Sequence, residues 1–413
     1  MNRRELERLD KELGSYIDDL TAGMGRKERV RAMGWYITGL LLDGERKSIE
    51  PMAARLVDQS SEIQAMRQRL QECVTTSTWA DDDLFWRLAT KVQRELPGIE
   101  AFVLDDTGFP KKGKHSVGVA RQYSGTLGRI DNCQVAVSLH LAGELGSACI
   151  GMQLYLPKEW AEEPARRRKA GVPDEVVFQE KWKLALDRID AALTAGLPRH
   201  VTLADAGYGD IGEFRSGLRL RKLEYVVSVQ SAIAVWAPGT GPLPPQPWPD
   251  RNRAGKRYRT GEQKPVSLFD LANALGRGAC RTITWREGTK GKQRSRFNAL
   301  RVRTASRHVA GHAPGPEEWL LYEWPDDEKE PTKYWLSSLP ATTSLKRLVY
   351  LAKLRWRVER DYQDLKEEIG LDHYEGRTWR GFHHHITLSA VAHAFLALRR
   401  ALFPPEQNTV DAS

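Results

Sequence analysis

The stretch Ala101-Phe102-Val103-Leu104-Asp105-Asp106-Thr107-Gly108 decides the fold. Its apolar first half predicts a short buried strand, and its second half predicts a turn at the end of that strand. Side chains converge at strand ends in open α/β sheets, which is why functional sites commonly lie there. Asp106 is therefore a candidate site residue, although an aspartate in such a turn is also ordinary turn chemistry.

The chain that follows this stretch continues with strands and helices. The patterns predict strands Gln134–Leu141 and Ala148–Leu156, a helix over 174–195, strand His200–Leu203, helix Ile211–Leu223 and strand Tyr225–Val229. The strand at His200–Leu203 again ends at an aspartate, Asp205, which is the second candidate site residue. Successive strands, followed by strands that alternate with helices, predict an α/β fold with a mixed sheet and helices on both faces. This is the order expected of a ribonuclease-H-like core.

The flanking segments have a different character. Residues 1–97 show apolar residues at helical spacing and predict a helical N-terminal domain, for which DNA binding is a hypothesis. The core is predicted to span 98–236 and to resume at 341–403, while the tail 404–413 is predicted to be disordered. The predicted N-terminal helices cover about residues 6–20, Arg26–Leu42, Pro51–Val57, Glu62–Gln71 and Asp81–Leu96.

Residues 237–340 are predicted to form a small β domain inserted into the core. Its predicted strands are Thr282–Trp285, Arg296–Thr304, Trp319–Trp324 and Lys333–Leu336. The segment from Arg251 to Arg307 holds 16 Lys and Arg against 3 Asp and Glu, whereas the whole chain has a net charge of +9. Such a concentration of charge favours a flap that neutralises DNA phosphates, and a solvated flexible lobe is the alternative.

A third candidate acid lies on a long helix predicted over residues 343–369. On one continuous helix, Arg355, Glu359, Tyr362 and Lys366 share a face, because they are spaced by four, three and four residues. The alternative interpretation is an exposed face of ion pairs worth about 0.3–0.5 kcal/mol each. A last helix is predicted over Phe382–Leu402.

These motifs together resemble the DDE transposases of insertion sequences. Arg355, Glu359 and Lys366 match the R-E-K part of the Y-R-E-K signature, although the signature's Tyr position is Ala352 here, so that its role is either absent or taken over by Tyr362. The stretches 104–113 and 203–210 resemble the two strands that carry the catalytic aspartates in that family. The runs 333–337, 355–362 and 370–377 are similar to the 701-type subgroup.

The resemblance implies both an active site and a mechanism. It selects Asp106 over Asp105, and it implies that Asp106, Asp205 and Glu359 hold two Mg²⁺ or Mn²⁺ ions for phosphoryl transfer on DNA. No covalent protein nucleophile is expected. The residues expected to contact DNA are Arg355, Lys366, Tyr362, Lys111, Lys112, Arg121 and Trp335. For Lys111, Lys112 and Arg121 simple solvation is the alternative, and for Trp335 it is ordinary packing.

Composition and motifs exclude several other classes of protein. The four cysteines form no C-x-x-C pair, which excludes a zinc ribbon, and no apolar run is long enough for a membrane span. The segment Gly108–Gly113 lacks the Lys-Ser or Lys-Thr of a nucleotide-binding P-loop, so no nucleotide cofactor is expected. We interpret His383-His384-His385 as a helix start, because adjacent helical residues point about 100° apart and cannot close on one ion.

The sequence therefore predicts a cytoplasmic, nucleoid-associated bacterial transposase. Its expected partners are double-stranded DNA, at the terminal inverted repeats and the target, and a second copy of the chain. Another metal-dependent nuclease of ribonuclease-H-like fold, such as a resolvase, is an alternative. A non-catalytic DNA-binding descendant is another, and the three acids argue against it.

Overall fold

The computed structural model describes residues 3–125, 128–246, 258, 263–288, 291–305 and 314–402. The chain forms two compact units, Met1–Pro198 with Trp356–Ser413 and Arg199–Arg355, which are described one at a time. The predicted tail 404–413 and part of the basic segment 251–307 lie outside the described residues. The division into an N-terminal domain, a two-part core, an insertion and a tail stays a prediction.

The first unit begins with the helices predicted for residues 1–97. They are α1 (Arg3–Thr21), α2 (Lys27–Leu41), α3 (Ile49–Arg55), the 3₁₀ turn η1 (Ser60–Glu62), α4 (Ile63–Thr75) and α5 (Asp81–Glu95). The later apolar positions that predicted α1 supply its buried face, with Tyr16, Ile17 and Leu20 at 7% exposure or less, whereas Leu6 is 46% exposed. The Tyr16 hydroxyl donates a hydrogen bond to the Val391 carbonyl at 2.9 Å, which ties α1 to the C-terminal helix.

The sheet of this unit consists of β1 (Ile99–Pro110), β2 (Ala120–Ser124), β3 (Arg129–Gly143) and β4 (Ser147–Leu154). β3 pairs antiparallel with β1, and it also pairs antiparallel with β2 and with β4. The predicted turn at Asp105–Gly108 is wrong, because the β1–β3 pairing runs on without a break from Ala101 to Pro110. Cross-strand hydrogen bonds here override the turn preference of Asp-Asp-Thr-Gly.

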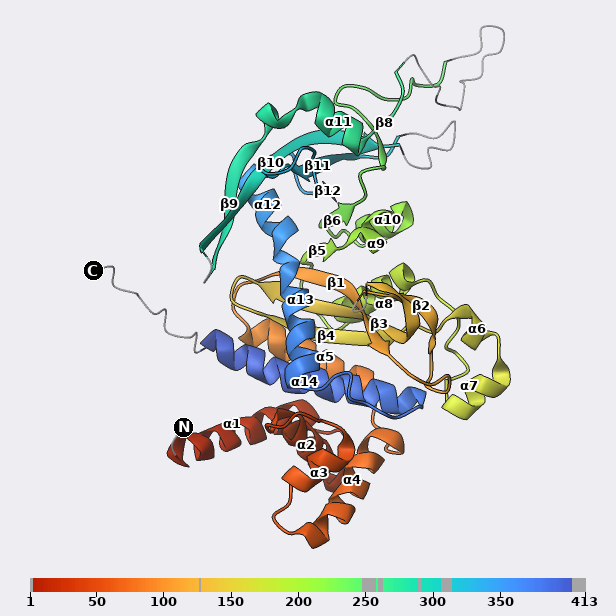
Figure 1. Cartoon of the computed structure of the whole chain (residues 1–413), viewed down its shortest axis with the longest axis vertical. Coiled ribbons are helices and arrows are strands. Elements are labelled where there is room, and N and C mark those ends of the chain that lie inside the picture. The colour runs from red at the N-terminus through yellow and green to blue at the C-terminus, as the bar shows by residue number, and fades with distance from the viewer. Residues whose placement is uncertain are drawn as a thin grey trace, which may run out of the picture. The chain divides into compact units, whose positions relative to one another are not determined.

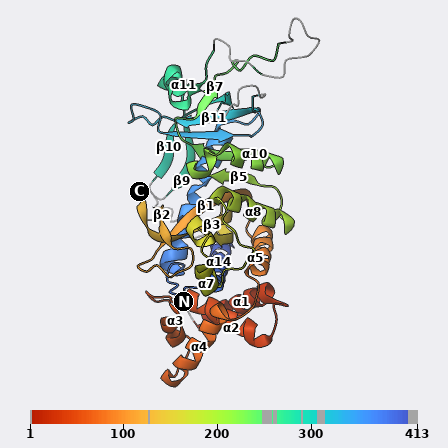
Figure 2. The same ribbon diagram turned by 90° about the vertical axis from the view of Figure 1, so that its right-hand side faces the viewer.

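Helices cover this sheet on both faces, as predicted. The helices after β4 are α6 (Lys158–Ala161), α7 (Pro164–Ala170) and α8 (Lys181–Thr194), and the unit closes with α13 (Trp356–Gln363), the π-helix η3 (Asp364–Glu368) and α14 (Trp379–Leu402). Side-chain contacts place α13 and α14 on one face of β1 and β3, and α8 on the other. Figures 1 and 2 show the same layers from two sides.

Two helix predictions need correction. The helix predicted over 174–195 begins only at Lys181, because Val177 is 61% exposed and Phe178 packs edge-on against Tyr155 instead of continuing a helical stripe. The single helix predicted over 343–369 is divided into α12 (Leu345–Leu354), α13 and η3, with a break at Arg355. It ends where predicted, since Gly370 adopts φ +77°.

The three adjacent histidines lie in the second turn of α14, and their side chains point to three different neighbours. His383 bonds the Trp379 carbonyl at 2.9 Å, His384 bonds the Trp79 carbonyl at 3.0 Å, and His385 bonds the Tyr36 hydroxyl at 2.9 Å. The predicted helix is present, but it begins at Trp379, three residues before the predicted Phe382, so the histidine run is not its start. Within the described part of the chain, neither α14 nor any other helix is long and apolar enough to cross a membrane.

The second unit opens with β5 (Val201–Ala204), α9 (Ala206–Gly209), α10 (Gly212–Leu220) and β6 (Tyr225–Val229). β5 and β6 pair in parallel, which is the strand–helix–strand unit that the sequence predicted. Gly209 lies so close to β6 that a Cβ atom there would come within 1.9 Å of the Ser228 carbonyl oxygen. Glycine at this position therefore lets the turn after Asp205 pack directly on the neighbouring strand.

The rest of the second unit contains the predicted β insertion. It comprises β7 (Ala234–Trp236), β8 (Val266–Ser267), α11 (Leu268–Leu275), η2 (Arg277–Ala279), β9 (Arg281–Gly288), β10 (Gly291–Thr304), β11 (Glu317–Glu323), β12 (Lys333–Ser337) and α12. The four predicted strands are confirmed as β9 to β12. β9 and β10 form the long hairpin seen in Figure 1, and the sheet continues from β10 through β11 and β12 to β6.

Burial of the α14 histidines predicts a loss of stability in mild acid. Burial lowers the pKa of His384 and of His385 to about 4, whereas a histidine in the unfolded chain has a pKa of about 6.5. Between these values the unfolded state binds more protons, so we expect the free energy of unfolding to fall as the pH drops from about 6.5 to about 4. Urea denaturation at a series of pH values measures this.

The variant His384→Gln should flatten that pH dependence, because it removes one of the titrating groups. His115→Gln is the matched control, since His115 is exposed and its substitution should leave the profile unchanged. A wild-type stability that is equal at pH 7 and pH 5 would contradict the prediction.

Candidate active site

Asp105 and Asp106 lie on opposite faces of the sheet. Both are half-buried in β1, where Asp105 pairs with Ser138 and Asp106 pairs with Val137 on β3. Successive side chains of a strand point to opposite faces, and directly paired residues share a face. Asp105 therefore shares the Ser138 face, whereas Asp106 shares the Val137 face.

Asp106 is held on its face by an ion pair with Lys181. Lys181 is the first residue of α8, and its ammonium contacts the Asp106 carboxylate directly. The two side chains are 37% and 24% exposed, so the pair is partly shielded from water. A carboxylate with a neutralising ammonium beside it is a poor ligand for a cation, because the two positive charges would compete for it.

The opposite face, which Asp105 shares, carries the helix with Glu359. Tyr362 of α13 bonds Ser138 with an oxygen–oxygen distance of 2.6 Å, and either hydroxyl can donate. Lys366 of η3 donates to the Gly108 carbonyl on β1 at 3.1 Å. Tyr362 and Lys366 of the predicted stripe thus face the sheet, whereas Glu359 of the same stripe is exposed.

A buried polar network fastens α13 to β3. His140 bonds Ser138 through Nε2 at 2.9 Å, and its Nδ1 donates to an Asp361 carboxylate oxygen at 2.7 Å. Ser147 donates to the other Asp361 oxygen at 2.6 Å. All these side chains are at most 5% exposed, so the network fixes the register of α13 on the sheet from inside the core.

Within this network the His140 imidazolium and the Asp361 carboxylate each stabilise the charged form of the other. Burial opposes an imidazolium at His140, but the neighbouring Cys149 and the Asp361 carboxylate outweigh it and raise the pKa of His140 to about 10. Burial likewise opposes the Asp361 carboxylate, but its hydrogen bond with His140 lowers the pKa of Asp361. Asp361 and His140 therefore form a buried ion pair across the helix–sheet interface.

The second predicted acid, Asp205, lies in the second unit directly after β5. It begins α9, and its carbonyl accepts the Gly209 amide at 2.8 Å. The prediction that Asp205 follows the end of a strand is confirmed. Since β5 and β6 are parallel, Asp205 stands at the carboxyl edge of a parallel pair, the position at which α/β sheets commonly carry functional groups.

Arg355 and Trp335 also belong to the second unit. Arg355 follows α12 at the helix break and is half-exposed. Trp335 is only 4% exposed in β12, and the Lys353 ammonium lies 5.4 Å from its ring centroid. Lys353 also bonds Glu323 at 2.6 Å, so Trp335 has the surroundings of a packing residue.

The predicted DNA-contacting lysines of the first unit differ in accessibility. Lys112 and Arg121 are exposed, whereas Lys111 is half-buried and donates to the Tyr374 carbonyl at 2.8 Å. Lys366 is half-buried as well, and burial lowers its pKa. Free cations for a polyanion are therefore offered by Lys112 and Arg121 before the other two.

Some described cations of the β insertion meet acids, whereas others are exposed. Near β11, Arg296 pairs with Asp326 and Arg303 lies 3.5 Å from Glu317. Towards the tip of the β9–β10 hairpin, the exposed cations are Arg286, Lys292 and Arg294, and elsewhere in the insertion they include Lys264, Arg281, Lys329 and Lys333.

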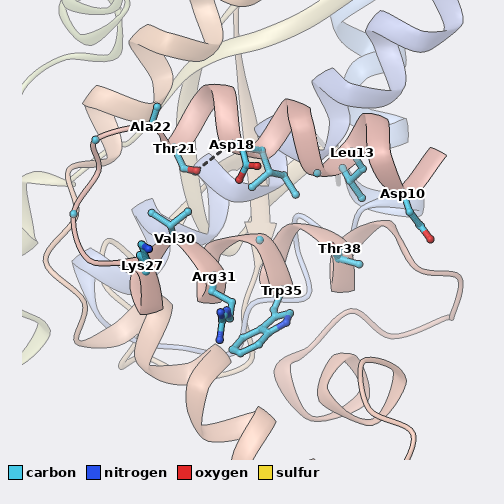
Figure 3. A pocket seen from close by; sticks show the side chains of 15 residues that line it. Asp10, Leu13, Asp18, Thr21, Ala22, Lys27, Val30, Arg31, Trp35 and Thr38 are labelled. Atoms are coloured by element: carbon cyan, nitrogen blue, oxygen red, sulfur yellow. Dashed lines mark hydrogen bonds between the residues drawn. The ribbon is translucent and has the colours of Figure 1, made fainter. Parts of the chain in front are cut away.

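A groove between α1 and α2 has a different character. Its volume is about 660 Å³, and Figure 3 shows apolar side chains such as Leu13 and Val30 on its walls. Its charged residues are two acids and two bases, namely Asp10, Asp18, Lys27 and Arg31. A groove with this balance of charge does not fit a polyanion.

The donor chemistry of the candidate site fits a divalent cation. Asp105 and Glu359 offer half-exposed and exposed carboxylate oxygens, the ligands that Mg²⁺ and Mn²⁺ prefer. Within either unit, no three His, Cys, Asp or Glu side chains among the described residues are gathered closely enough to hold a metal ion by themselves.

Sequence reasoning missed Lys181 and the His140–Asp361 pair. A signal for the pair exists, because Ser138 and His140 interrupt an otherwise apolar strand at alternate positions and so require a polar partner on one face. No local signal marks Lys181, since 75 residues separate it from Asp106.

Comparison with known proteins agrees with the resemblance drawn from the sequence. The chain matches the family described as DDE superfamily endonuclease over residues 19–292. A relative from Microchaete diplosiphon, named "Probable transposase for insertion sequence element IS701", is 32% identical over 195 residues. This alignment covers 47% of each protein, so the chain spans about half the length of the curated relative that it matches.

The buried network predicts a large loss of stability for Asp361→Ala. This change leaves the His140 imidazolium buried without its counter-charge, which typically costs about 3–5 kcal/mol. Urea denaturation at pH 7 measures the free energy of unfolding.

Glu368→Ala is the matched control, since it removes an exposed acid from the neighbouring helical turn. It should change the stability by about 0.5 kcal/mol at most. Equal effects of the two substitutions would show that the network contributes nothing.

Proposed function

The chain belongs to the DDE superfamily of endonucleases, and on that premise we propose that it is a DNA transposase. In this proposal it cuts DNA at the ends of an insertion sequence and joins those ends to target DNA. The similarity to the IS701 protein supports the choice of transposition over other endonuclease functions, and a nuclease without strand transfer is the alternative. The proposal rests chiefly on the carboxylates carried by β1, by the end of β5 and by α13.

Family membership implies that the reaction uses divalent metal, and we propose two ions, Mg²⁺ or Mn²⁺. When bound, such a pair activates the attacking oxygen and stabilises the leaving oxygen of an in-line displacement. Asp205 and Glu359 are two of the proposed ligands. The work of the protein is then to hold their carboxylates in place, and the His140–Asp361 network does this for the helix of Glu359.

For the first carboxylate we propose Asp105, although the sequence resemblance selected Asp106. Asp105 shares the sheet face against which Tyr362 and its helix pack, and that helix also carries Glu359. Asp106 faces α8 and is neutralised by Lys181. Coordination of a metal ion by Asp106 would first require this ion pair to break.

We propose that DNA is contacted by solvent-accessible cations of both units. Lys112 and Arg121, which are exposed, and Arg355, which is half-exposed, fit this role, together with the tip of the β9–β10 hairpin. Their contacts with phosphates would give affinity without sequence preference. Lys366, Tyr362 and Trp335 act in this proposal within the protein, because Lys366 and Tyr362 hydrogen-bond to β1 and β3 and Trp335 is buried.

Substitution of the acids separates the two candidates on β1. We expect Asp105→Asn, Asp205→Asn and Glu359→Gln each to lower metal-dependent DNA cleavage by about 10³-fold or more. Asp106→Asn is the matched control on the adjacent residue and should retain most of the activity. Cleavage of a labelled duplex, with thermal unfolding as the check on folding, measures this.

Loss of cleavage in Asp106→Asn with normal cleavage in Asp105→Asn would restore Asp106 as the first carboxylate. Normal cleavage by either Asp205→Asn or Glu359→Gln would remove that residue from the proposal.

Joining of DNA distinguishes a transposase from a simple nuclease. Purified protein is incubated with Mg²⁺ or Mn²⁺, a target plasmid and duplexes taken from the DNA that flanks this gene. We expect duplex ends covalently joined to the plasmid, and no product when EDTA removes the metal. Cut duplexes without joined products would favour the nuclease, and wild-type activity in EDTA would contradict the metal requirement.

A further inference from the structure

A second cavity of the first unit lies where β1 ends. Its volume is about 330 Å³, and three segments far apart in the sequence line it: Arg46, the loop from Lys111 to Ser116, and the loop from Asp372 to Arg377. The loop 111–116 continues the strand that carries Asp105. Lys111 lies six positions after Asp105 along extended chain, a span of about 20 Å.

Hydrogen bonds fix the walls of this cavity. The Lys111 ammonium donates to the Tyr374 carbonyl at 2.8 Å, and the Val117 amide donates to the Arg377 carbonyl at 3.1 Å. The Asn132 side chain donates to the Gly113 carbonyl at 3.0 Å. The Lys47 amide donates to His373 at 3.1 Å, which ties in the segment that carries Arg46. The cavity is therefore preformed, so binding of a ligand loses little conformational entropy in ordering its walls.

Basic side chains outnumber acidic ones among the residues that line the cavity. Arg46, Lys112 and Arg377 are exposed at its rim, and Lys111 lies in its wall. Two acids, Asp372 and Glu375, oppose them. The excess of cations fits an anionic ligand with several oxygens.

Glu375 already contacts one of these cations. Its carboxylate lies 3.6 Å from the Arg46 guanidinium, and the two side chains are 72% and 75% exposed. An ion pair this open to water contributes little, typically about 0–1 kcal/mol. A phosphate could replace the carboxylate at small cost, because Arg46 would exchange one anion for another.

We propose that this cavity binds a backbone phosphate of DNA, and that Glu375 occupies Arg46 until the phosphate replaces it. The site rests on the proposed function, since it would hold duplex DNA about six base pairs from the Asp105 carboxylate. It adds Arg46 and Arg377 to the residues that contact DNA. In this proposal Glu375 weakens DNA binding, because it competes with the phosphate for Arg46, whereas Arg46 and Arg377 strengthen it.

The test measures binding in the absence of divalent metal, so that cleavage plays no part. The full-length protein is titrated against a fluorescent 30-base-pair duplex of arbitrary sequence over a range of salt concentrations. We expect the double variant Lys112→Ala/Arg377→Ala to bind more weakly and to flatten the slope of log K against log salt by about 1–2, since each lost phosphate contact removes about 0.9. Glu375→Gln should bind several-fold more tightly than the wild type.

The double variant Arg4→Ala/Lys11→Ala is the matched control. It removes the same charge from exposed positions on α1 and should leave the slope unchanged. The proposal is overturned if the Lys112/Arg377 slope equals that of the wild type, if the control changes the slope equally, if Glu375→Gln weakens binding, or if the wild type does not bind the duplex.

A cleavage assay with metal separates this proposal from the proposed function. A changed slope in a protein that never cuts DNA would keep the phosphate site and reject the transposase. If the Lys112/Arg377 variant leaves the salt slope unchanged in a protein that cuts and joins DNA, the transposase is kept and the phosphate site is rejected.

Discussion

The antiparallel pairing of β1 with β3 is the constraint on which the rest of the first unit depends. Ten residues of β1, from Ala101 to Pro110 and including the acids at 105 and 106, are held in one register against β3. Because the side-chain period of a strand is two, this register assigns each acid to a face. A shift of one residue would exchange the two aspartates and place the neutralised carboxylate beside the helix of Glu359.

The same register explains why polar residues are buried in this strand pair. Ser138 and His140 lie on the face that Asp105 shares, and they meet Tyr362 and Asp361 from α13. A buried charge pair of this kind contributes little net stability, yet it permits only one arrangement of helix and sheet. We interpret it as a device that positions the Glu359 helix, with the π-helix η3 allowing Lys366 to reach the β1 backbone.

The basic side chains of this protein differ in whether they lie beside an acidic side chain or are exposed to solvent. Cations that meet acids, such as Arg296 and Arg303 in the β insertion, hold the fold together. Those at the β9–β10 tip and at the end of β1 are open to solvent. The net charge of +9 therefore says little by itself, whereas the location of the exposed cations indicates where a polyanion would lie.

The sequence by itself determined the order of the longer strands and helices, the two acids on or beside strands and the resemblance to DDE enzymes, because periodicity and motifs are local properties, whereas β2, α6, α7, β7, β8 and α11 were not predicted. Strand Tyr225–Val229 has the predicted bounds, and Asp205 follows a strand as expected. Only the tertiary structure decided that β1 runs past its turn-like residues, that the long helix breaks at Arg355, and which of Asp105 and Asp106 faces α13. These outcomes depend on cross-strand register and on partners such as Lys181 and Ser138, which are distant in the chain and leave no local trace.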